Sequence, residues 1–351
     1  MTSKVYRIGI VGASSLMGKE LSEELGDSSL AASRIVLLED EDESVGKLTA
    51  SGDEISLIQR LDRSAFEGMD FVFFAGQRDE TVKYWQDARK AGAGIVDLTY
   101  ALEGEKDVLV ASPWISEAAG RKSALGGEFD LGTQTVIPAH PVVVMLGVVA
   151  ARIQRQFPLH AIAATVMEPA SEYGSAAMDE LHQQTVSLLS FQDLPREQYD
   201  AQVSFNLLAS LGDAAKVKLS ATEERIQREY RVLSNGSLPQ LSLQMVQAPV
   251  FHGYVASVYL ETAEPITTLQ LEDALAGEHL DLVAEGSESP SNVSAAGQEE
   301  IMIRARKGFD GDGAGTRFWL WMAADNLKLA AVHAIACAGE LGRLRPSGKV
   351  Q

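Results

Sequence analysis

A short apolar strand, followed at once by a glycine-rich turn and an amphipathic stretch, constrains the fold of this chain most. Residues 6–11 read YRIGIV, residues 12–18 read GASSLMG, and KELSEEL then has a helical pattern. A run rich in β-branched residues beside glycines is typical of a buried strand. Strand, glycine turn and helix in this order predict the first βα unit of a nucleotide-binding sheet.

The same alternation continues through the first part of the chain. Strands are predicted at 34–38, 71–75, 94–98, 108–111 and 135–137, with a helix at 79–92. Strands that alternate with helices are typical of βαβ units around a parallel sheet. The predicted fold class is therefore α/β, with a doubly wound nucleotide-binding domain.

The alternation of short strands and helices ends after His140. A length of 351 residues is typical of two domains, so a second domain is expected to follow. A long apolar helix is predicted at 141–157, with its proline in the first turn. Further strands are predicted at 161–167, 241–246 and 255–261, a helix at 176–189 and a loop at 285–300. The chain closes with the strand-like FWLWMA and an apolar helix.

The charge balance excludes several partners as first expectations. The chain has 30 Lys and Arg against 49 Asp and Glu, a net charge of −19. Such a charge repels phosphate backbones and anionic lipid, so we expect no nucleic acid and no membrane among the partners. The chain begins without the apolar segment of a signal peptide, and its longest apolar run, 141–151, is shorter than the roughly 20 residues of a spanning helix. We therefore expect a cytoplasmic protein.

The glycine turn is the candidate cofactor site. Glycines there let backbone N–H groups approach a phosphate at the positive end of a helix. The candidate cofactor-binding residues are Gly12, Ser14, Ser15, Leu16, Met17 and Gly18. A tight strand–helix turn that binds nothing is the alternative.

Five consecutive acidic residues, 39–43, follow the second predicted strand. In a doubly wound domain this place meets the adenosine ribose, where a carboxylate accepts a hydrogen bond from a 2′-OH and repels a 2′-phosphate. One like-charge pair at about 4 Å costs ~1–4 kcal/mol. NADP is therefore disfavoured, which leaves NAD or no cofactor as the alternatives. A solvated acidic loop without a ligand is the competing interpretation.

Several segments, in order along the chain, resemble the aspartate-semialdehyde dehydrogenase family. They are GIVGASSLMGKEL (9–21), AGAGIVDLTYALE (91–103), VLVASPWIS (108–116), TVIPAHPVVVMLG (135–147), EPASEYGSAAMDEL (168–181), FNLLASLGD (205–213), APVFHGYVASVYLE (248–261) and WMAADNLKLAA (321–331). The resemblance implies a dinucleotide-binding-like domain over 1–140 and 325–351. It also implies a mixed α+β dimerisation and substrate-type domain over 141–324.

The resemblance also implies which residues the family's chemistry would need. In that family a cysteine attacks the aldehyde, NADP accepts the hydride and phosphate releases the acyl group, because a thiolate supports both steps. Matched without gaps, the nucleophile position is Pro141, the carboxylate-binding arginine is Gln247 and the acid/base histidine is Tyr254. We therefore expect no catalytic residues in this chain.

Other matched positions are acidic where the family binds an anion. The phosphate-site arginine matches Glu103, and the arginine near the NADP phosphate matches the acidic run near Glu43. The substrate-contacting glutamine matches Glu168, the following loop becomes the SEYG of 171–174, and Glu229 loosely matches a substrate glutamate. This pattern is similar to the Usg-type paralogues, which keep the fold without the catalytic residues.

Other cysteine, histidine and glutamate residues are weighed as substitutes for the missing catalytic groups, and structural roles explain most of them. Cys337 lies in an apolar helix and is typical of a buried filler rather than a nucleophile. His252 and Tyr254 would share one face of a strand. His140, Glu168 and His252 could together hold zinc, but histidine and glutamate in a cleft are usually hydrogen-bonded lining, so we expect no metal.

The resemblance implies a homodimer formed through the sheet of the second domain, and a heteromer with an active paralogue is left open. Trp319 and Trp321 alternate on a strand, which indicates either core packing or a dimer interface. The expected function is that of a family-like binding or partner protein without the NADP- and phosphate-dependent activity. The alternative is an NAD-dependent oxidoreductase acting on another substrate.

Overall fold

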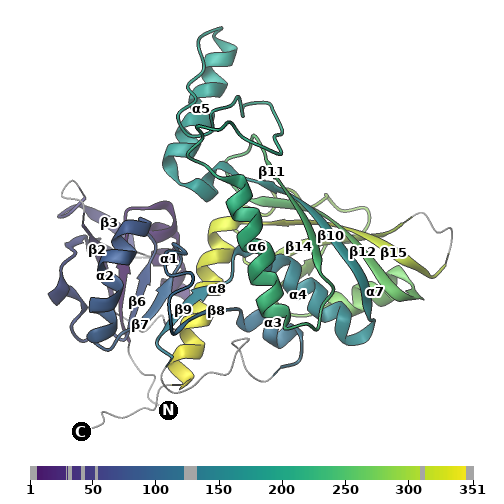
Figure 1. Cartoon of the computed structure of the whole chain (residues 1–351), viewed down its shortest axis with the longest axis horizontal. Coiled ribbons are helices and arrows are strands. Elements are labelled where there is room, and N and C mark those ends of the chain that lie inside the picture. Colours follow the sequence, from purple (N-terminus) through teal and green to yellow (C-terminus); the bar gives the residue numbers. More distant parts are fainter. Residues whose placement is uncertain are drawn as a thin grey trace. The chain divides into compact units, whose positions relative to one another are not determined.

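The computed structural model describes residues 6–28, 30, 34–40, 44–51, 54–121, 133–308 and 313–344 (Figure 1). The chain divides into two compact units. The first comprises Met1–Ser116, Lys122–Ala139 and Ala330–Gln351. The second comprises Glu117–Arg121 and His140–Leu329.

The first unit contains a seven-stranded sheet in the order β5-β2-β1-β6-β7-β9-β8, in which every paired strand is parallel. The strands are β1 (Arg7–Val11), β2 (Arg34–Glu39), β5 (Gln59–Arg60), β6 (Phe71–Phe74), β7 (Gly94–Asp97), β8 (Val108–Ala111) and β9 (Thr135–Pro138). A separate hairpin joins β3 (Leu48–Ser51) and β4 (Glu54–Leu57). The helical elements are α1 (Leu16–Asp27), η1 (Arg63–Phe66), α2 (Arg78–Lys90), α3 (Pro113–Ala118) and α8 (Asn326–Leu344). The last two residues of α3 and the first four of α8 belong to the second unit.

The strand β6 shows why this sheet is covered on both faces. Phe71 and Phe73 pack into one core with residues of α1 and α8, while Val72 and Phe74 pack into another with Tyr84 and Trp85 of α2. Alternate side chains of a strand point to opposite faces, so a strand covered on both sides is a continuous apolar run. The doubly wound α/β prediction is confirmed.

The second unit contains a mixed six-stranded sheet in the order β11-β10-β12-β15-β14-β13. Its strands are β10 (Leu159–Glu168), β11 (Leu241–Gln247), β12 (Tyr254–Ile266), β13 (Leu280–Leu282), β14 (Ile301–Lys307) and β15 (Gly315–Ala324). The pairs β10–β11 and β13–β14 are parallel, and the other pairs are antiparallel. The helical elements are α4 (Pro141–Gln156), η2 (Ala170–Tyr173), α5 (Ser175–Leu189), α6 (Leu219–Ser234) and α7 (Thr268–Leu275).

Helices cover one face of this second sheet, where α6 contacts β11, α4 contacts β10 and α7 contacts β14 (Figure 1). The other face is partly open along β15, where Trp319 and Trp321 are 37% and 38% exposed while Phe318, Leu320 and Met322 are buried. Near the end of β15 the 285–300 loop covers this face: Ala295 packs with the buried Ala323, and Trp321 Nε1 donates to the carbonyl of Pro290. The core-packing interpretation of the two tryptophans is therefore wrong within a single chain.

The predicted elements recur with shifts of a few residues at their ends, and residues 285–300 form a loop as predicted. Several elements were not predicted from the sequence, namely β3, β4, β5 and α3 in the first unit and α6, α7, β13 and β14 in the second. Among the described helices, none combines the length and the apolar character needed to cross a membrane.

Candidate functional site

The glycine turn follows β1 in the first unit and passes very close to the turn after β6. Gly12 has φ +81°, and a Cβ on it would lie 2.1 Å from the Cα of Gly76. A Cβ on Gly18 would lie 2.2 Å from the carbonyl oxygen of Gly12. Glycine is therefore required at both positions by the close approach of backbones, and at Gly12 also by its left-handed conformation.

Internal hydrogen bonds hold the predicted cofactor residues of this turn. Ser15 is the N-cap of α1: its Oγ accepts from the N–H of Gly18 at 2.8 Å and donates to the carbonyl of Ala75 at 2.7 Å. The N–H of Ser14 donates to Glu39 Oε1 at 2.5 Å. Leu16 and Met17 lie in the first turn of α1, where N–H groups have no acceptor within the helix.

The acidic end of β2 adjoins a pocket of about 440 Å³ lined by Asp40, Gln77, Arg78, Asp79 and Glu80. Lys83 Nζ donates to Asp40 Oδ2 at 2.6 Å, and the hydroxyl of Tyr84 donates to Asp40 Oδ1 at 3.0 Å. These hydrogen bonds, that from Lys83 first, lower the pKa of Asp40 below its usual value. Of the five consecutive acids, residues 41–43 lie outside the described residues, including the predicted Glu43.

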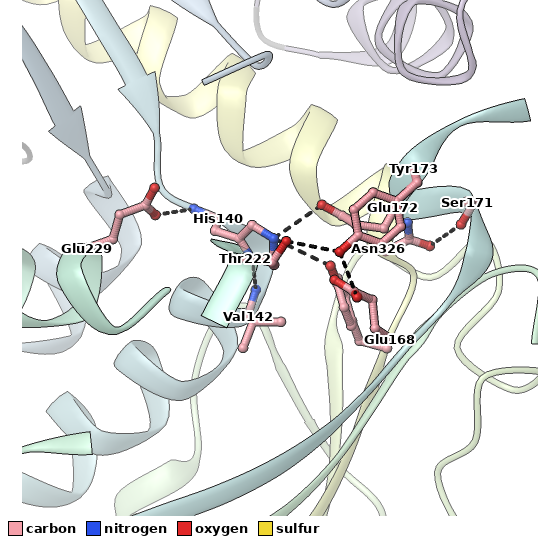
Figure 2. Close-up of polar contacts among 10 residues, drawn as sticks. His140, Val142, Glu168, Ser171, Glu172, Tyr173, Thr222, Glu229 and Asn326 are labelled. Carbon is pink, nitrogen blue, oxygen red and sulfur yellow. Dashed lines mark hydrogen bonds and ion pairs between the residues drawn. The ribbon is translucent and has the colours of Figure 1, made fainter. Parts of the chain in front are cut away.

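In the second unit, Pro141 is the first residue of α4 and His140 is its N-cap. His140 Nδ1 accepts from the N–H of Val142 at 3.2 Å, and Nε2 lies 3.2 Å from Glu172 Oε1 (Figure 2). The backbone N–H of His140 donates to Glu229 Oε2 at 2.8 Å. Both ring nitrogens are occupied, so His140 holds the start of the helix and has no lone pair available for proton abstraction.

Two carboxyl groups beside this histidine carry different protonation states. Burial, and secondarily repulsion by Glu172, raises the pKa of Glu168 well above its usual value. Burial also acts to raise the pKa of Glu172, but hydrogen bonds, that from His140 first, outweigh it and lower that pKa. We conclude that Glu168 is the neutral acid and Glu172 the charged one, since like charges in a buried site resist joint ionisation.

The neutral Glu168 is incompletely hydrogen-bonded. The hydroxyl of Tyr173 donates to its Oε2 at 3.0 Å and lies 3.0 Å from Thr222 Oγ1 (Figure 2). Its other oxygen, Oε1, is buried and has no hydrogen-bond partner among the described residues.

The matched positions of the acid/base and of the carboxylate-binding arginine are also buried. Burial, and secondarily the charge of Glu172, raises the pKa of Tyr254 well above its usual value, so its phenol remains a donor and not a base. Its hydroxyl lies 3.5 Å from His140 Nε2. Gln247 Nε2 donates to the carbonyls of Glu168 and Ala248, both at 3.1 Å. The structure thus places Gln247 and Tyr254 in the same buried, hydrogen-bonded region as His140 and Glu168.

Asn326 joins this region, and the sequence analysis missed it. Its Oδ1 accepts from Ser171 Oγ at 3.1 Å and from the N–H of Gly253 at 3.0 Å. The segment WMAADN was quoted for the resemblance, but a role for its asparagine depends on contacts more than 70 residues away along the chain.

Two of the alternatives weighed for the site are wrong. His252 does not share a strand face with Tyr254, because β12 begins at Tyr254 and Gly253, with φ +84°, breaks the extended backbone between them. The ligand atoms of His140, Glu168 and His252 do not form a group within 4.8 Å.

Among the described residues, one group of three ligand-type side chains does converge, at Glu117, Glu278 and His279. Both carboxylates act on the neighbouring guanidinium of Arg152, whose Nη1 and Nη2 donate to the carbonyls of Leu275 and Glu278. An arginine already supplies the positive charge there, so the group has an explanation without a metal.

Cys337 is fully buried in α8, as predicted, and its Sγ lies 3.7 Å from the carbonyl of Ala111. Burial raises the pKa of its thiol, so it stays protonated. Glu103 lies in the turns after β7 in the first unit and is partly exposed.

Comparison with known proteins identifies the family to which this two-domain chain belongs. A family model described as the NAD binding domain of semialdehyde dehydrogenase matches residues 7–122, and one described as the dimerisation domain of semialdehyde dehydrogenase matches 151–329. The chain belongs to the semialdehyde dehydrogenase family. The family prediction and the two-domain fold are confirmed.

Relatives of this family member match it end to end. A USG-1 protein homolog of Pseudomonas aeruginosa is 28% identical and covers 97% of this chain and 98% of its own length. An aspartate-semialdehyde dehydrogenase of Rickettsia bellii is 24% identical, with 97% and 98% covered.

Solved structures agree with this fold. The structure of a probable aspartate-semialdehyde dehydrogenase from Pseudomonas aeruginosa has a TM-score of 0.81 at 26% identity, with 97% of this chain and 98% of that chain covered. Aspartate semialdehyde dehydrogenase II of Vibrio cholerae has a TM-score of 0.80 at 22% identity, with 97% and 99% covered, and shows the fold alone.

Proposed function

We propose that this family member binds NAD in preference to NADP and does not catalyse the phosphate-dependent oxidation of aspartate semialdehyde. It acts instead as a binding or partner protein. The observation that carries the proposal is the place of the chain's single cysteine: Cys337 is fully buried in α8 with its thiol protonated. A thioester mechanism needs an accessible thiolate, and no other residue of the chain supplies one.

The cluster in the second unit supports the loss of this reaction. The nucleophile position is Pro141, which has no reactive side-chain group. Tyr254 is held neutral at the base position, and Gln247 supplies an amide in place of a guanidinium that could pair with a carboxylate. The charged Glu172 beside them repels an anionic substrate.

Features of the first unit support the binding of a dinucleotide that lacks a 2′-phosphate. The glycine turn and the first turn of α1 provide the backbone geometry that binds a pyrophosphate. An aspartate semialdehyde dehydrogenase of Candida albicans has been solved with NADP, at 14% identity to this chain. Asp40 in the pocket after β2 favours a 2′-OH over a 2′-phosphate here.

We propose a cytosolic homodimer joined through the open face of the second sheet. Trp319 and Trp321 leave apolar area on that face, and the matching family model is described as a dimerisation domain. A heteromer with an active relative would use the same face.

The second candidate is an NAD-dependent oxidoreductase acting on another substrate. It is favoured by the intact glycine turn, because hydride transfer to NAD needs the cofactor site but no thioester. This function requires turnover with NAD, which the first proposal excludes.

The experiment combines calorimetry with an assay for reduced nicotinamide. The full chain is titrated with NAD and NADP, then supplied with aspartate semialdehyde, phosphate and each cofactor, with an active aspartate-semialdehyde dehydrogenase as the positive control. We expect NAD binding without change in absorbance. Steady turnover with phosphate, or a labelled acyl group trapped on any side chain, would refute the first proposal.

A Pro141→Cys variant gives a matched test of the missing groups. Restoring only the thiol should yield no steady turnover, since Tyr254 and Gln247 still lack the base and the cation. Turnover in this variant would show that the rest of the catalytic machinery is present.

A further inference from the structure

The pocket beside Asp40 lies where the adenosine end of a dinucleotide is expected. In the first sheet, β1 lies between β2 and β6, so the chain reverses its direction of winding there. Ligands of open parallel sheets bind outside the carboxyl ends of the strands at such a switch point. Asp40 directly follows β2, and Gln77–Glu80 follow β6, so the pocket of about 440 Å³ adjoins this point.

The acidic side chains at this place have different tasks. Glu39 is only 3% exposed, and its carboxylate accepts the N–H of Ser14, so it supports the glycine turn. Glu80 accepts the N–H of Gln77 at 3.1 Å at the start of α2. Asp40 lines the pocket and is the acid that holds a cation.

That cation is Lys83, and its position makes it able to serve a ligand. Its Nζ lies 2.6 Å from Asp40 Oδ2 and 4.6 Å from the centroid of the Tyr84 ring. The lysine side chain is 57% exposed, so it can turn toward a ligand without leaving a packed core. The hydroxyl of Tyr84 donates to the other Asp40 oxygen at 3.0 Å. Arg78, which lines the pocket too, donates to the carbonyl of Thr99 at 2.9 Å.

We propose that Asp40 sets the nucleotide preference by holding the two donors, Lys83 and Tyr84, that would otherwise bind a 2′-phosphate. The carboxylate takes the place of the phosphate as their acceptor and adds a negative charge that repels it. A 2′-OH adds no charge, so NAD is compatible with the pair. This inference rests on the proposed binding of a dinucleotide.

The test measures dissociation constants of NAD and NADP by calorimetry on the full chain and on three variants. Asp40→Asn removes the charge at nearly constant shape. Asp40→Asn combined with Lys83→Ala removes the cation as well. Asp87→Asn is the charge-matched control, because Asp87 lies on α2, as Lys83 does, but pairs with Arg63 and Lys90 instead of Lys83.

We expect Asp40→Asn to tighten NADP binding about tenfold or more, the effect of one hydrogen bond to a charged group, and to change NAD binding less than about threefold. The gain should be clearly smaller in the double variant, where only the loss of repulsion and the release of Tyr84 remain, and absent in Asp87→Asn. No gain in Asp40→Asn, a gain that Lys83→Ala leaves undiminished, or an equal gain in the control would each overturn the inference.

The wild-type titration separates this inference from the proposed function. If the wild-type chain binds NAD and Asp40→Asn gains no NADP affinity, the inference alone fails. If neither protein binds either nucleotide, both fail. If only the variant binds NADP, the inference holds and the proposed NAD binding fails.

Discussion

The glycine turn of the first unit and the buried cluster of the second differ in what they are made of. The turn is built from backbone: Gly12 and Gly76 approach so closely that no side chain fits between them. The cluster is built from side chains that hydrogen-bond one another, with His140 between Glu172 and the start of α4. Backbone geometry is tied to the packing of the sheet, whereas side chains can be exchanged while the fold persists.

This difference explains how one chain can keep a nucleotide fold and lack the family's chemistry in our proposal. A change at the turn disturbs the first sheet itself. A change in the cluster requires only that each new polar group finds a partner, as Tyr173 does with Glu168 and Thr222.

The largest expected effect tests whether the turn depends on its backbone. Gly12→Ala should lower the free energy of unfolding by about 3 kcal/mol or more, because a positive φ and a 2.1 Å clash with Gly76 combine. Gly46→Ala is the matched control, with φ +83° but nothing within 4 Å of the new Cβ, and should cost about 1–2 kcal/mol. Urea unfolding measures both, and equal losses would contradict a role for the close approach.

The next effect tests whether His140 is structural. His140→Ala removes the N-cap of α4 and the partner of Glu172, and should cost about 2 kcal/mol or more. His140→Asn keeps a capping side chain and should be less destabilising by about 1 kcal/mol. Thermal unfolding of the two variants measures the difference, and identical losses would show that the cap contributes nothing.

A third prediction concerns the pH dependence that the neutral Glu168 creates. Its pKa is raised in the folded state above the usual 4.5, so its contribution to stability is complete below that value and is lost as pH rises toward the folded-state pKa. Glutamine cannot ionise, so the free energy of unfolding of Glu168→Gln should rise relative to that of the wild type as pH increases, by about 1 kcal/mol at alkaline pH.

Urea unfolding at a series of pH values measures this difference in the free energy of unfolding. The same change at exposed Glu264 in the same unit should stay within about 0.5 kcal/mol of the wild type at each pH. A difference between Glu168→Gln and the wild type that does not grow with pH would show that Glu168 is charged in the fold.

The smallest effect on folding is expected at the open face. Trp319→Ser should change the free energy of unfolding of one chain by less than about 1 kcal/mol, because the side chain is 37% exposed. It should weaken self-association about tenfold or more if this face joins two copies. Analytical ultracentrifugation measures the dissociation constant. Phe191→Ser, at a side chain 97% exposed beyond α5, is the control, and an equal loss there would exclude the sheet face as the interface.

Local patterns were sufficient for most of the first unit. The run at Phe71–Phe74 reads as a buried strand because both of its faces are apolar, and the order of strands and helices indicates a parallel sheet. In the second unit, α6 went unpredicted although its buried residues Leu219, Ile226, Tyr230 and Leu233 recur at helical spacing, a signal that was present in the sequence. The two tryptophans showed a strand but not which face of the sheet lacks a cover.

For the candidate site, too, some features could be predicted from the sequence and others could not. The glycines and the acidic run are visible in the sequence and predicted the kind of fold, and the proline at position 141 shows that this position carries no thiol. That Glu168 is neutral, that Glu172 is charged and that Asp40 holds Lys83 depend on residues distant in the sequence. The sequence alone determined which chemical groups are present, because composition and spacing do not change on folding. Only the tertiary structure decided their charge and their partners, because burial and neighbouring charges arise when distant segments pack together.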